Sequence, residues 1–395
     1  MQNTVLLWLV ELVVIIRIKV SNKLLIIVNV DWFFLSHRLP IAVEAIKQGY
    51  EVHIATTVTD KLDLLERSGL IVHDLSLHRS RSGVLIISEL WSLLFIIKAI
   101  NPDIVHLVTI KPVLLGGIAA RLAKVPAIVS AISGLGFVFH SNGFTSFVRY
   151  KLTSLFYYFS LGHKNQMIIF QNKDDKSKIC KIRSDVCNRS TLIPGSGIDL
   201  SLYSVMENNL NPPTVMMAAR LLSSKGVREF IQASKIVNES NKAVRFILVG
   251  DIDLLNPESI KESELSQWKS EGVVEIWGYR DDMYNVIPNA SIIVLPSYYG
   301  EGLPKVLIEA AACGRAVITT DHPGCRDAVT PETGILIPIK DPVALANAIQ
   351  GLLQNPQKIV RMGESGRELA EQNYSIEKVC EVHIKIYQDL LPEAS

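Results

Sequence analysis

Two carboxylates stand eight positions apart in a short segment of the 395-residue chain, at Glu301 and Glu309. A turn of Gly302, Leu303 and Pro304 follows the first, and the apolar stretch after it predicts a helix that starts near Leu303. A ligand can approach this backbone closely because Gly302 lacks Cβ, and the amides of Gly302 and Leu303 are expected to remain available as donors. Each carboxylate can accept hydrogen bonds from two hydroxyl groups, so that one carboxylate could bind a sugar ring and the other a ribose. The pair therefore suits a nucleotide sugar, although a capped surface helix whose acids serve only its dipole has the same spacing.

The segment before this turn predicts how the two acids are positioned. Residues 291–295 (SIIVL) are β-branched and apolar and are followed by Pro296, which indicates a buried strand of a parallel sheet. Glu301 then falls in the loop after the strand, and Glu309 lies about two turns inside the helix. Ligands of open α/β sheets bind beyond the carboxyl ends of the strands, so this loop is the predicted site.

Strand-like and helix-like segments alternate twice along the chain, which predicts an α/β protein with two Rossmann-like domains facing a central cleft. The segment 204–214, rich in asparagine and proline, is the expected linker. We therefore expect an N-terminal domain over residues 23–203 and a C-terminal domain over residues 204–375. A last helical segment follows in residues 376–395.

Composition excludes some classes of function. A net charge of +1 argues against a nucleic-acid partner, because neither half has the basic excess that phosphate-backbone binding needs. The cysteines show no spacing typical of a metal site, and we expect reduced thiols. A disulfide between Cys180 and Cys187 is the weaker alternative.

The first residues form an apolar extension, residues 1–22. Its core, residues 5–16 (VLLWLVELVVII), is interrupted by Glu11 and is too short to span a membrane. Positive residues follow the apolar run instead of preceding it, unlike in a secretory signal. If the extension did insert, the positive-inside rule would leave the catalytic body in the cytoplasm. The favoured alternative is an upstream extension of the reading frame, so that a chain beginning at Lys23 should fold and keep its activity.

The spacing of Glu301 and Glu309 resembles the Glu-x7-Glu signature of retaining glycosyltransferases with the GT-B fold, most closely those of family 4. Arg220 and Lys225, in MAARLLSSKGVREF, resemble that family's strand-end arginine and helix-start lysine, which hold the donor diphosphate. The similarity extends from about residue 23 to residue 391.

Other segments agree with this resemblance. Residues 277–297, which include Tyr279 and Arg280, resemble the segment that covers the nucleotide base, and residues 191–200 resemble the loop that enters the interdomain hinge. By the same resemblance, the last helix crosses back to the N-terminal domain. Gly134 and Gly136, in SGLGFVF, stand where a loop faces the donor diphosphate, although a GxG pair alone is a weak signal.

The resemblance implies an activity without a metal cofactor. Arg220 and Lys225 would neutralise the diphosphate, Glu309 would bind the ribose, and Glu301 would bind the donor sugar near its 3- and 4-hydroxyls. No residue is an obvious nucleophile. Retention would then proceed by attack on the same face, with the departing phosphate accepting the acceptor's proton.

The N-terminal domain should hold the acceptor, and here the chain departs from the common family pattern. Residues 31–40 (DWFFLSHRLP) contain no glycine, so Ser36, His37 and Arg38 are the polar candidates after the first strand. Arg38 suits a phosphate, and His37 suits an acceptor hydroxyl or a phosphate oxygen. The alternative for His37 is a helix-start residue bonded to backbone. Lys111 is a further acceptor candidate that either faces a phosphate or is a solvated lysine.

Residues 144–164 combine aromatic and basic side chains, as in helices that lie on a membrane surface. Phe147, Leu152, Leu155 and Phe159 are its apolar members. The alternative is an ordinary helix buried against the sheet.

Taken together, these features predict transfer of a sugar from a nucleotide donor, with UDP favoured, to an undecaprenyl-diphosphate-linked saccharide. The expected pathway is O-antigen or polysaccharide assembly, and the expected place is the cytoplasmic face of the bacterial inner membrane, bound peripherally. Two alternatives remain open, a nucleotide-sugar epimerase of the same fold and an inactive sugar-nucleotide-binding subunit.

Overall fold

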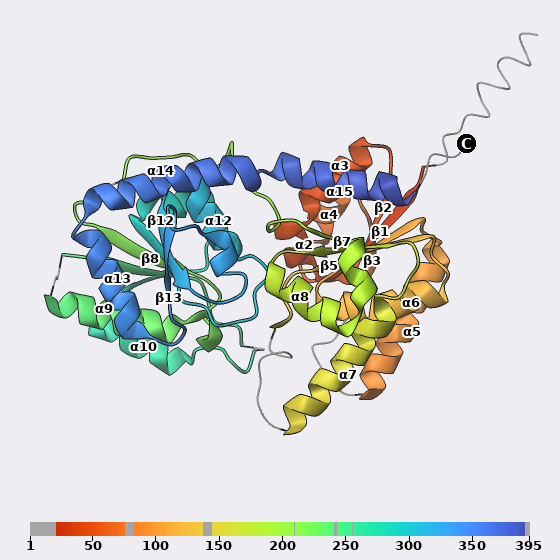
Figure 1. Cartoon of the computed structure of the whole chain (residues 1–395), viewed down its shortest axis with the longest axis horizontal. Coiled ribbons are helices and arrows are strands. Elements are labelled where there is room, and N and C mark those ends of the chain that lie inside the picture. Colours follow the sequence, from red (N-terminus) through yellow and green to blue (C-terminus); the bar gives the residue numbers. More distant parts are fainter. Residues whose placement is uncertain are drawn as a thin grey trace, which may run out of the picture.

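The computed structural model describes residues 21–75, 83–136, 144–208, 210–240, 243–254 and 256–391. The apolar extension lies outside the described residues, apart from its last two positions. Within the described part, two α/β domains lie side by side (Figure 1).

The N-terminal domain contains a parallel sheet of seven described strands in the order β3-β2-β1-β4-β5-β6-β7. The strands are β1 (Lys23–Val30), β2 (Glu51–Thr57), β3 (Ile71–Asp74), β4 (Ile104–Val108), β5 (Ala127–Ile132), β6 (Gln166–Phe170) and β7 (Ser190–Leu192). The α-helices of this domain are α2 (Asp31–His37), α3 (Leu39–Lys47), α4 (Leu62–Arg67), α5 (Gly83–Ile100), α6 (Gly117–Leu122), α7 (Phe144–Ser160) and α8 (Lys173–Ile182). The described part of this domain also contains a π-helix, η1 (Pro112–Gly116), and a 3-10 helix, η3 (Ser184–Arg189).

The C-terminal domain repeats this plan with six described parallel strands in the order β10-β9-β8-β11-β12-β13. The strands are β8 (Thr214–Ala218), β9 (Arg245–Val249), β10 (Glu275–Gly278), β11 (Ile292–Leu295), β12 (Ala316–Thr320) and β13 (Gly334–Ile337). Its helices are η4 (Ser223–Lys225), α9 (Val227–Ser240), α10 (Glu262–Glu271), α11 (Met283–Val286), η5 (Ile287–Asn289), α12 (Lys305–Ala312), η6 (Arg326–Ala328) and α13 (Pro342–Leu353). The predicted fold of two Rossmann-like domains is confirmed.

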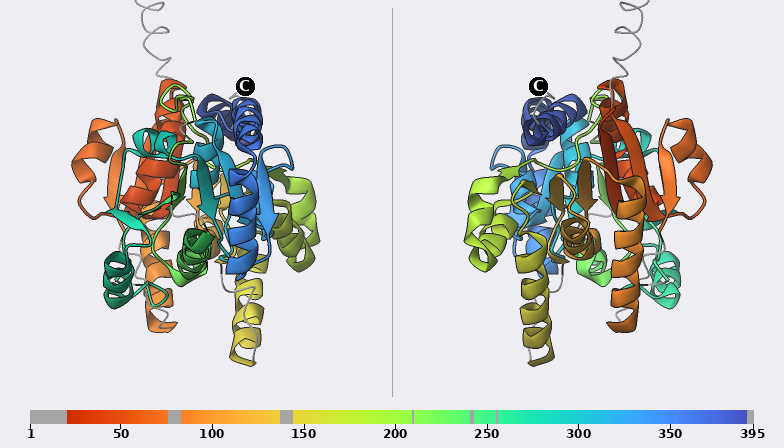
Figure 2. Two further views of the ribbon diagram at one scale, coloured as in Figure 1. Left: turned by 90° about the vertical axis from the view of Figure 1, so that its left-hand side faces the viewer. Right: turned by 90° about the vertical axis from the view of Figure 1, so that its right-hand side faces the viewer.

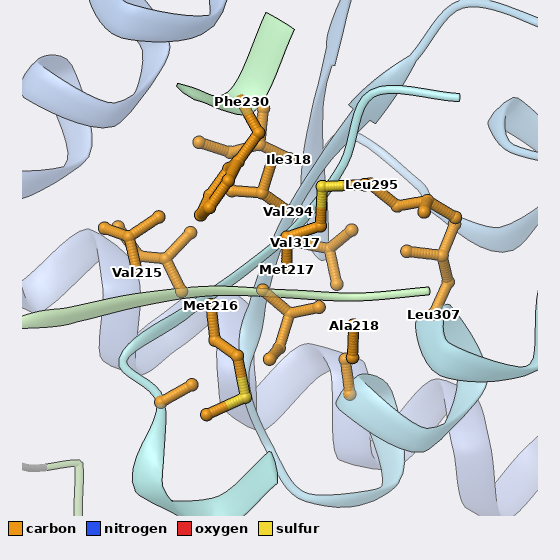
Figure 3. Close-up of a cluster of buried hydrophobic side chains, with 14 of the residues drawn as sticks. Val215, Met216, Met217, Ala218, Phe230, Val294, Leu295, Leu307, Val317 and Ile318 are labelled. Carbon is orange, nitrogen blue, oxygen red and sulfur yellow. The ribbon is translucent and has the colours of Figure 1, made fainter. Parts of the chain in front are cut away.

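The central strands are mostly apolar and are buried over their whole length because helices cover both faces of each sheet. All residues of β4, β8, β11 and β12 are buried. In the C-terminal domain, Phe230 of α9 and Leu307 of α12 pack with side chains of β8, β11 and β12 (Figure 3). The two sheets are therefore rigid supports for the loops at their carboxyl ends.

The chain passes between the domains at two neighbouring places. Between β7 and β8, Ile198 N donates to Tyr374 O at 2.8 Å, and Ile376 N donates back to Ile198 O at 2.9 Å. Tyr374 and Ile376 join α14 (Pro356–Asn373) to α15 (Ile376–Leu390). These two helices run along one side of both domains, and α15 packs against α3 of the N-terminal domain (Figure 1). The paired crossings give the domains a common hinge.

The expectation of reduced thiols is wrong for one pair of cysteines. Cys180 and Cys187 form a disulfide, with Cα atoms 5.6 Å apart. The chain folds back from the end of α8 into η3, which brings the two side chains together, and residue spacing alone does not show this. The other three cysteines, Cys313, Cys325 and Cys380, are free and buried.

Candidate functional site

Glu301 lies in the loop between β11 and α12, which we call the Glu301 loop (residues 296–304). The helix begins at Lys305, two residues later than predicted, because Pro304 keeps an extended backbone with ψ 124°. Glu309 is therefore about one turn inside the helix instead of two. Glu309 lies in the interior, where it is 5% exposed.

Lys225 and Glu301 form an ion pair at the carboxyl end of the C-terminal sheet. Their side chains are only 14% and 12% exposed, and Ser297 Oγ also donates to Glu301 Oε1 at 3.0 Å. The turn that carries Lys225 packs tightly on the loop, since a Cβ at Gly226 would lie 2.3 Å from Pro296 O. The structure thus brings together two residues that are 76 positions apart in the sequence.

Arg220 and Tyr299 complete this cluster. The Lys225 ammonium lies 5.7 Å from the centre of the Tyr299 ring. Burial and the Glu301 carboxylate raise the pKa of Tyr299, and the Arg220 guanidinium opposes them. Arg220 is 45% exposed and contacts Asp253 at 3.2 Å. Both predicted diphosphate-binding cations therefore flank the Glu301 loop, and each is paired with an acid.

Glu309 is held by two groups through the same oxygen. Tyr203 Oη donates to Glu309 Oε1 at 2.8 Å, and Lys305 Nζ lies 3.8 Å from that atom. Burial raises the pKa of Glu309. The contact of Glu309 with the ribose stays a prediction.

The amide of Leu303 is not available to a ligand in this structure, contrary to the prediction. It donates to Gln171 Oε1 of the N-terminal domain at 3.1 Å. Gly134 and Gly136 also meet the loop from that domain, because Gly136 N donates to Gly300 O at 3.2 Å. Their expected contact with the diphosphate stays a prediction.

Ser36 and His37, at the end of α2, lie next to the start of α12. Lys305 Nζ donates to Ser36 O at 3.0 Å. His37 stacks on Phe33 with ring centres 4.2 Å apart, and its Nδ1 lies 3.2 Å from Phe33 O. The ring is thus bonded to backbone, as in the alternative considered, but it lies at a helix end instead of a helix start. Burial, together with the charges of Lys305 and Arg38, lowers the pKa of His37 to about 3, so the imidazole is neutral at neutral pH.

Arg38 points into the protein and is only 2% exposed. It donates to His37 O at 2.9 Å and lies 3.5 Å from Ser133 Oγ, while its Nε has no partner among the described residues. Burial lowers its pKa to about 10. The cation therefore lies behind the surface of the N-terminal domain.

Three predicted residues are held by other groups or are exposed. Lys111 pairs with the buried Glu89 of α5 at 2.6 Å. Arg280 pairs with Asp282 at 2.7 Å, and Tyr279 is 73% exposed. Their roles toward acceptor and base stay predictions.

Several contacts around the site were not predicted from the sequence. They are made by Gln171, Asn172, Tyr203, Ser297 and Lys305. The sequence signal for Asn172 is local, because Asn-Lys-Asp-Asp is typical of a helix start. The other contacts depend on the tertiary fold. No group of three or more histidine, cysteine or acidic side chains suited to a metal occurs among the described residues.

Helices α5 and α7 project from the N-terminal domain on the same side (Figure 2). The four apolar residues considered in α7 are each 50% or more exposed, which contradicts the alternative of a fully buried helix; they are Phe147, Leu152, Leu155 and Phe159. On α5, three apolar residues are 60–74% exposed, Ile87, Trp91 and Phe95. In the described ranges, no helix has the length and apolar character needed to cross a bilayer.

Comparison with known families gives two matches. Residues 23–172 match the model of glycosyl transferase 4-like proteins, and residues 212–355 match that of glycosyl transferases group 1. The two matches fall on the two domains in order and cover most of the chain.

Individual relatives extend over most of the chain. A Campylobacter jejuni protein, N,N'-diacetylbacillosaminyl-diphospho-undecaprenol alpha-1,3-N-acetylgalactosaminyltransferase, is 28% identical over 91% of this chain and 98% of its own. An Escherichia coli protein, UDP-Gal:alpha-D-GlcNAc-diphosphoundecaprenol alpha-1,3-galactosyltransferase, is 28% identical over 74% of this chain and 76% of its own. The structure of Anabaena HepE in complex with UDP-glucose has a TM-score of 0.73 at 18% identity, covering 93% of this chain and 99% of that one. This structural likeness shows the shared fold.

Proposed function

Because the chain is a glycosyltransferase of the GT-B fold and of the family 4 type, we propose that it transfers a hexose or N-acetylhexosamine from a UDP-linked donor with retention of configuration. The acceptor in this proposal is a saccharide on undecaprenyl diphosphate, in O-antigen or polysaccharide assembly. The observation that carries it is the cluster of Lys225, Arg220 and Glu301 at the carboxyl end of the C-terminal sheet. The acceptors named for the two similar enzymes support the lipid carrier.

The ion pair of Lys225 and Glu301 suggests how the donor is received. A diphosphate carries more charge than a carboxylate, so it would replace Glu301 as the partner of Lys225. Glu301 would then be released to accept from the hydroxyls of the donor sugar. Arg220 adds a second cation beside the leaving group, and together the two stabilise the charge that grows on the diphosphate.

Retention is supported by the names of the relatives and by chemistry. Both named relatives form alpha linkages, and UDP-galactose, the donor named for one of them, is itself an alpha-linked sugar nucleotide. An alpha product from an alpha donor requires retention. In this proposal, attack occurs on the face that the diphosphate leaves, and a phosphate oxygen takes the proton of the acceptor hydroxyl.

Peripheral attachment to the cytoplasmic face of the inner membrane belongs to the same proposal. The exposed apolar residues of α5 and α7 would enter the headgroup layer, and Arg149 and Lys151 of α7 would meet anionic lipids. Flotation with phosphatidylglycerol vesicles tests this. Leu152→Glu with Leu155→Glu should abolish binding, whereas Leu254→Glu with Val343→Glu, at exposed positions of the C-terminal domain, should not. Equal binding by both pairs would remove α7 from the proposal.

Nucleotide release from a panel of nucleotide sugars tests the activity itself. The proposed transferase releases UDP only when a lipid-linked saccharide is present, and the anomeric configuration of the product is read by NMR. An epimerase would convert the donor without any acceptor. An inactive subunit would bind the donor and release nothing.

A further inference from the structure

Two polar side chains of the N-terminal domain, Gln171 and Asn172, reach the Glu301 loop. Asn172 Nδ2 donates to Glu301 O and to Gly302 O, each at 3.1 Å. Gln171 Oε1 accepts from Leu303 N at 3.1 Å. Three successive residues of the loop are thus bonded to the opposite domain. We propose that Gln171 and Asn172 are positioning residues that hold the Glu301 loop in its reactive geometry through domain closure, a role that rests on the proposed transferase function.

Asn172 makes two kinds of contact at once. Its Oδ1 accepts from Asp175 N at 2.8 Å and caps the start of α8, while its Nδ2 reaches the loop. Serine and aspartate cap helices about as well as asparagine does, but neither carries an amide nitrogen. Nδ2 also donates to Asp175 Oδ2 at 3.0 Å, so the amide serves the start of α8 as well as the loop. The side chain is 1% exposed, so both contacts are made in the interior.

The backbone of the Glu301 loop lies very close to the backbone of the N-terminal domain. A Cβ at Gly302 would lie 2.0 Å from Gln171 Oε1 and 2.8 Å from Ser133 C. A Cβ at Gly134, which has φ +101°, would lie 2.5 Å from Gly300 O. Glycine is required at both positions for Gln171 and Asn172 to reach the loop.

Glu301 is consequently held from both domains. Its carboxylate is bound by Lys225 and Ser297 of the C-terminal domain, and its carbonyl is bound by Asn172 of the N-terminal domain. Opening at the hinge would break the bonds from the N-terminal domain to the loop, made by Asn172 and Gln171, and would free the Leu303 amide. Closure and assembly of the site are thereby coupled, as in enzymes whose domains close over their substrates.

Asn172→Ser tests this coupling because serine keeps the cap and removes the amide. We expect kcat to fall by about 10- to 100-fold while the donor KM changes by less than about threefold, since a misplaced loop costs the transition state more than donor binding. The matched control is Asn355→Ser, because Asn355 caps α14 in the same way, with Oδ1 3.2 Å from Lys358 N. This control should keep the activity of the parent.

Hydrogen exchange of residues 297–303 without substrate provides a readout independent of activity. The loop should exchange faster in Asn172→Ser and in Gln171→Met, and Gln171→Glu, which retains an acceptor for Leu303 N, should restore protection. Unchanged kcat in Asn172→Ser overturns the proposal, and so does unchanged exchange of the loop. Inactivity of the parent with every donor and acceptor would count against the proposed function alone, and exchange would still show whether the pair holds the loop.

Discussion

The two domains compensate their functional charges in different ways. In the C-terminal domain, Lys225 is paired with Glu301 and Arg220 with Asp253. In the N-terminal domain, Lys111 is also paired with an acid, Glu89, but Arg38 is buried and its described bonds go to a carbonyl and a hydroxyl. A cation that already has an acidic partner can exchange it for a phosphate at little cost in desolvation, whereas a buried cation without one is costly to keep.

The difference suggests that the donor side is assembled before the ligand arrives, with its own acids as temporary partners. The acceptor side has one such pair, Lys111 with Glu89, and in addition a buried cation without a described acidic partner, Arg38, and the neutral imidazole of His37. The predictions below test this contrast, beginning with the largest effect.

Lys225→Ala should give the largest loss of activity. Charge on the leaving diphosphate grows in the transition state, so kcat should fall by about 10²- to 10³-fold. Steady-state kinetics with saturating acceptor measure this, and Lys235→Ala, at a surface pair with Glu271, is the control. A kcat close to that of the parent would show that Lys225 serves only to balance Glu301.

Glu301→Gln should lower kcat more than it raises the donor KM. The amide keeps the shape but removes the charge beside the reacting sugar, and it leaves Lys225 without its acid. We expect a loss in kcat of roughly 10- to 100-fold, as for other lost charge-assisted contacts. An intact kcat would reduce Glu301 to a structural residue, and the central assignment would fail.

Glu309→Gln should act mainly on donor affinity. Loss of a charge-assisted hydrogen bond to the ribose costs about 1 to 3 kcal/mol, seen as a higher donor KM or as weaker UDP binding by calorimetry. Tyr203→Phe is the companion variant, because it removes the described bond to Oε1 and leaves the carboxylate in place. A larger effect of Tyr203→Phe than of Glu309→Gln would contradict the ribose role.

Acid should destabilise the N-terminal domain first. Burial, reinforced by Arg38, lowers the pKa of His383 to about 3, and burial lowers that of His106 well below its usual value. Between pH 6.5 and 3 the unfolded chain binds a proton that the folded chain does not, so stability falls as the pH decreases through this window. The loss for His383 at pH 5 is about 2 kcal/mol.

Melting temperatures at pH 7.5 and 5.0 measure this effect. The melting temperature of the His383→Met variant should decrease less than that of the parent. At pH 5.0, hydrogen exchange should increase more in the seven-stranded sheet than in the six-stranded one. An equal acid response of the two sheets would remove this part of the contrast between the domains.

Removal of metal should have the smallest effect. Since Lys225 and Arg220 supply the positive charge at the diphosphate, we expect excess EDTA to leave turnover almost unchanged. Initial rates with and without the chelator test this. A large loss that magnesium or manganese reverses would assign the leaving-group charge to a metal instead.

The sequence by itself determined the alternation of strands and helices and the loop that carries Glu301. These features are local: strands buried on both faces are continuous apolar runs, and turn residues end them. The resemblance to family 4 added Arg220 and Lys225, which the structure places beside the loop. The start of α12 was predicted two residues early, because Pro304 suits a first helical turn as well as the extended backbone it adopts.

Only the tertiary structure decided how these residues are used. The partners of the loop come from far along the chain, as in the bond from Asn172 to Gly302, 130 positions apart, and that from Tyr203 to Glu309, 106 positions apart. Burial of Arg38 and exposure of the apolar face of α7 likewise depend on which surfaces other elements cover. Local pattern specifies which backbone forms and which side chains are polar or apolar. Packing of the two domains specifies which polar groups meet, and no local pattern encodes those distances.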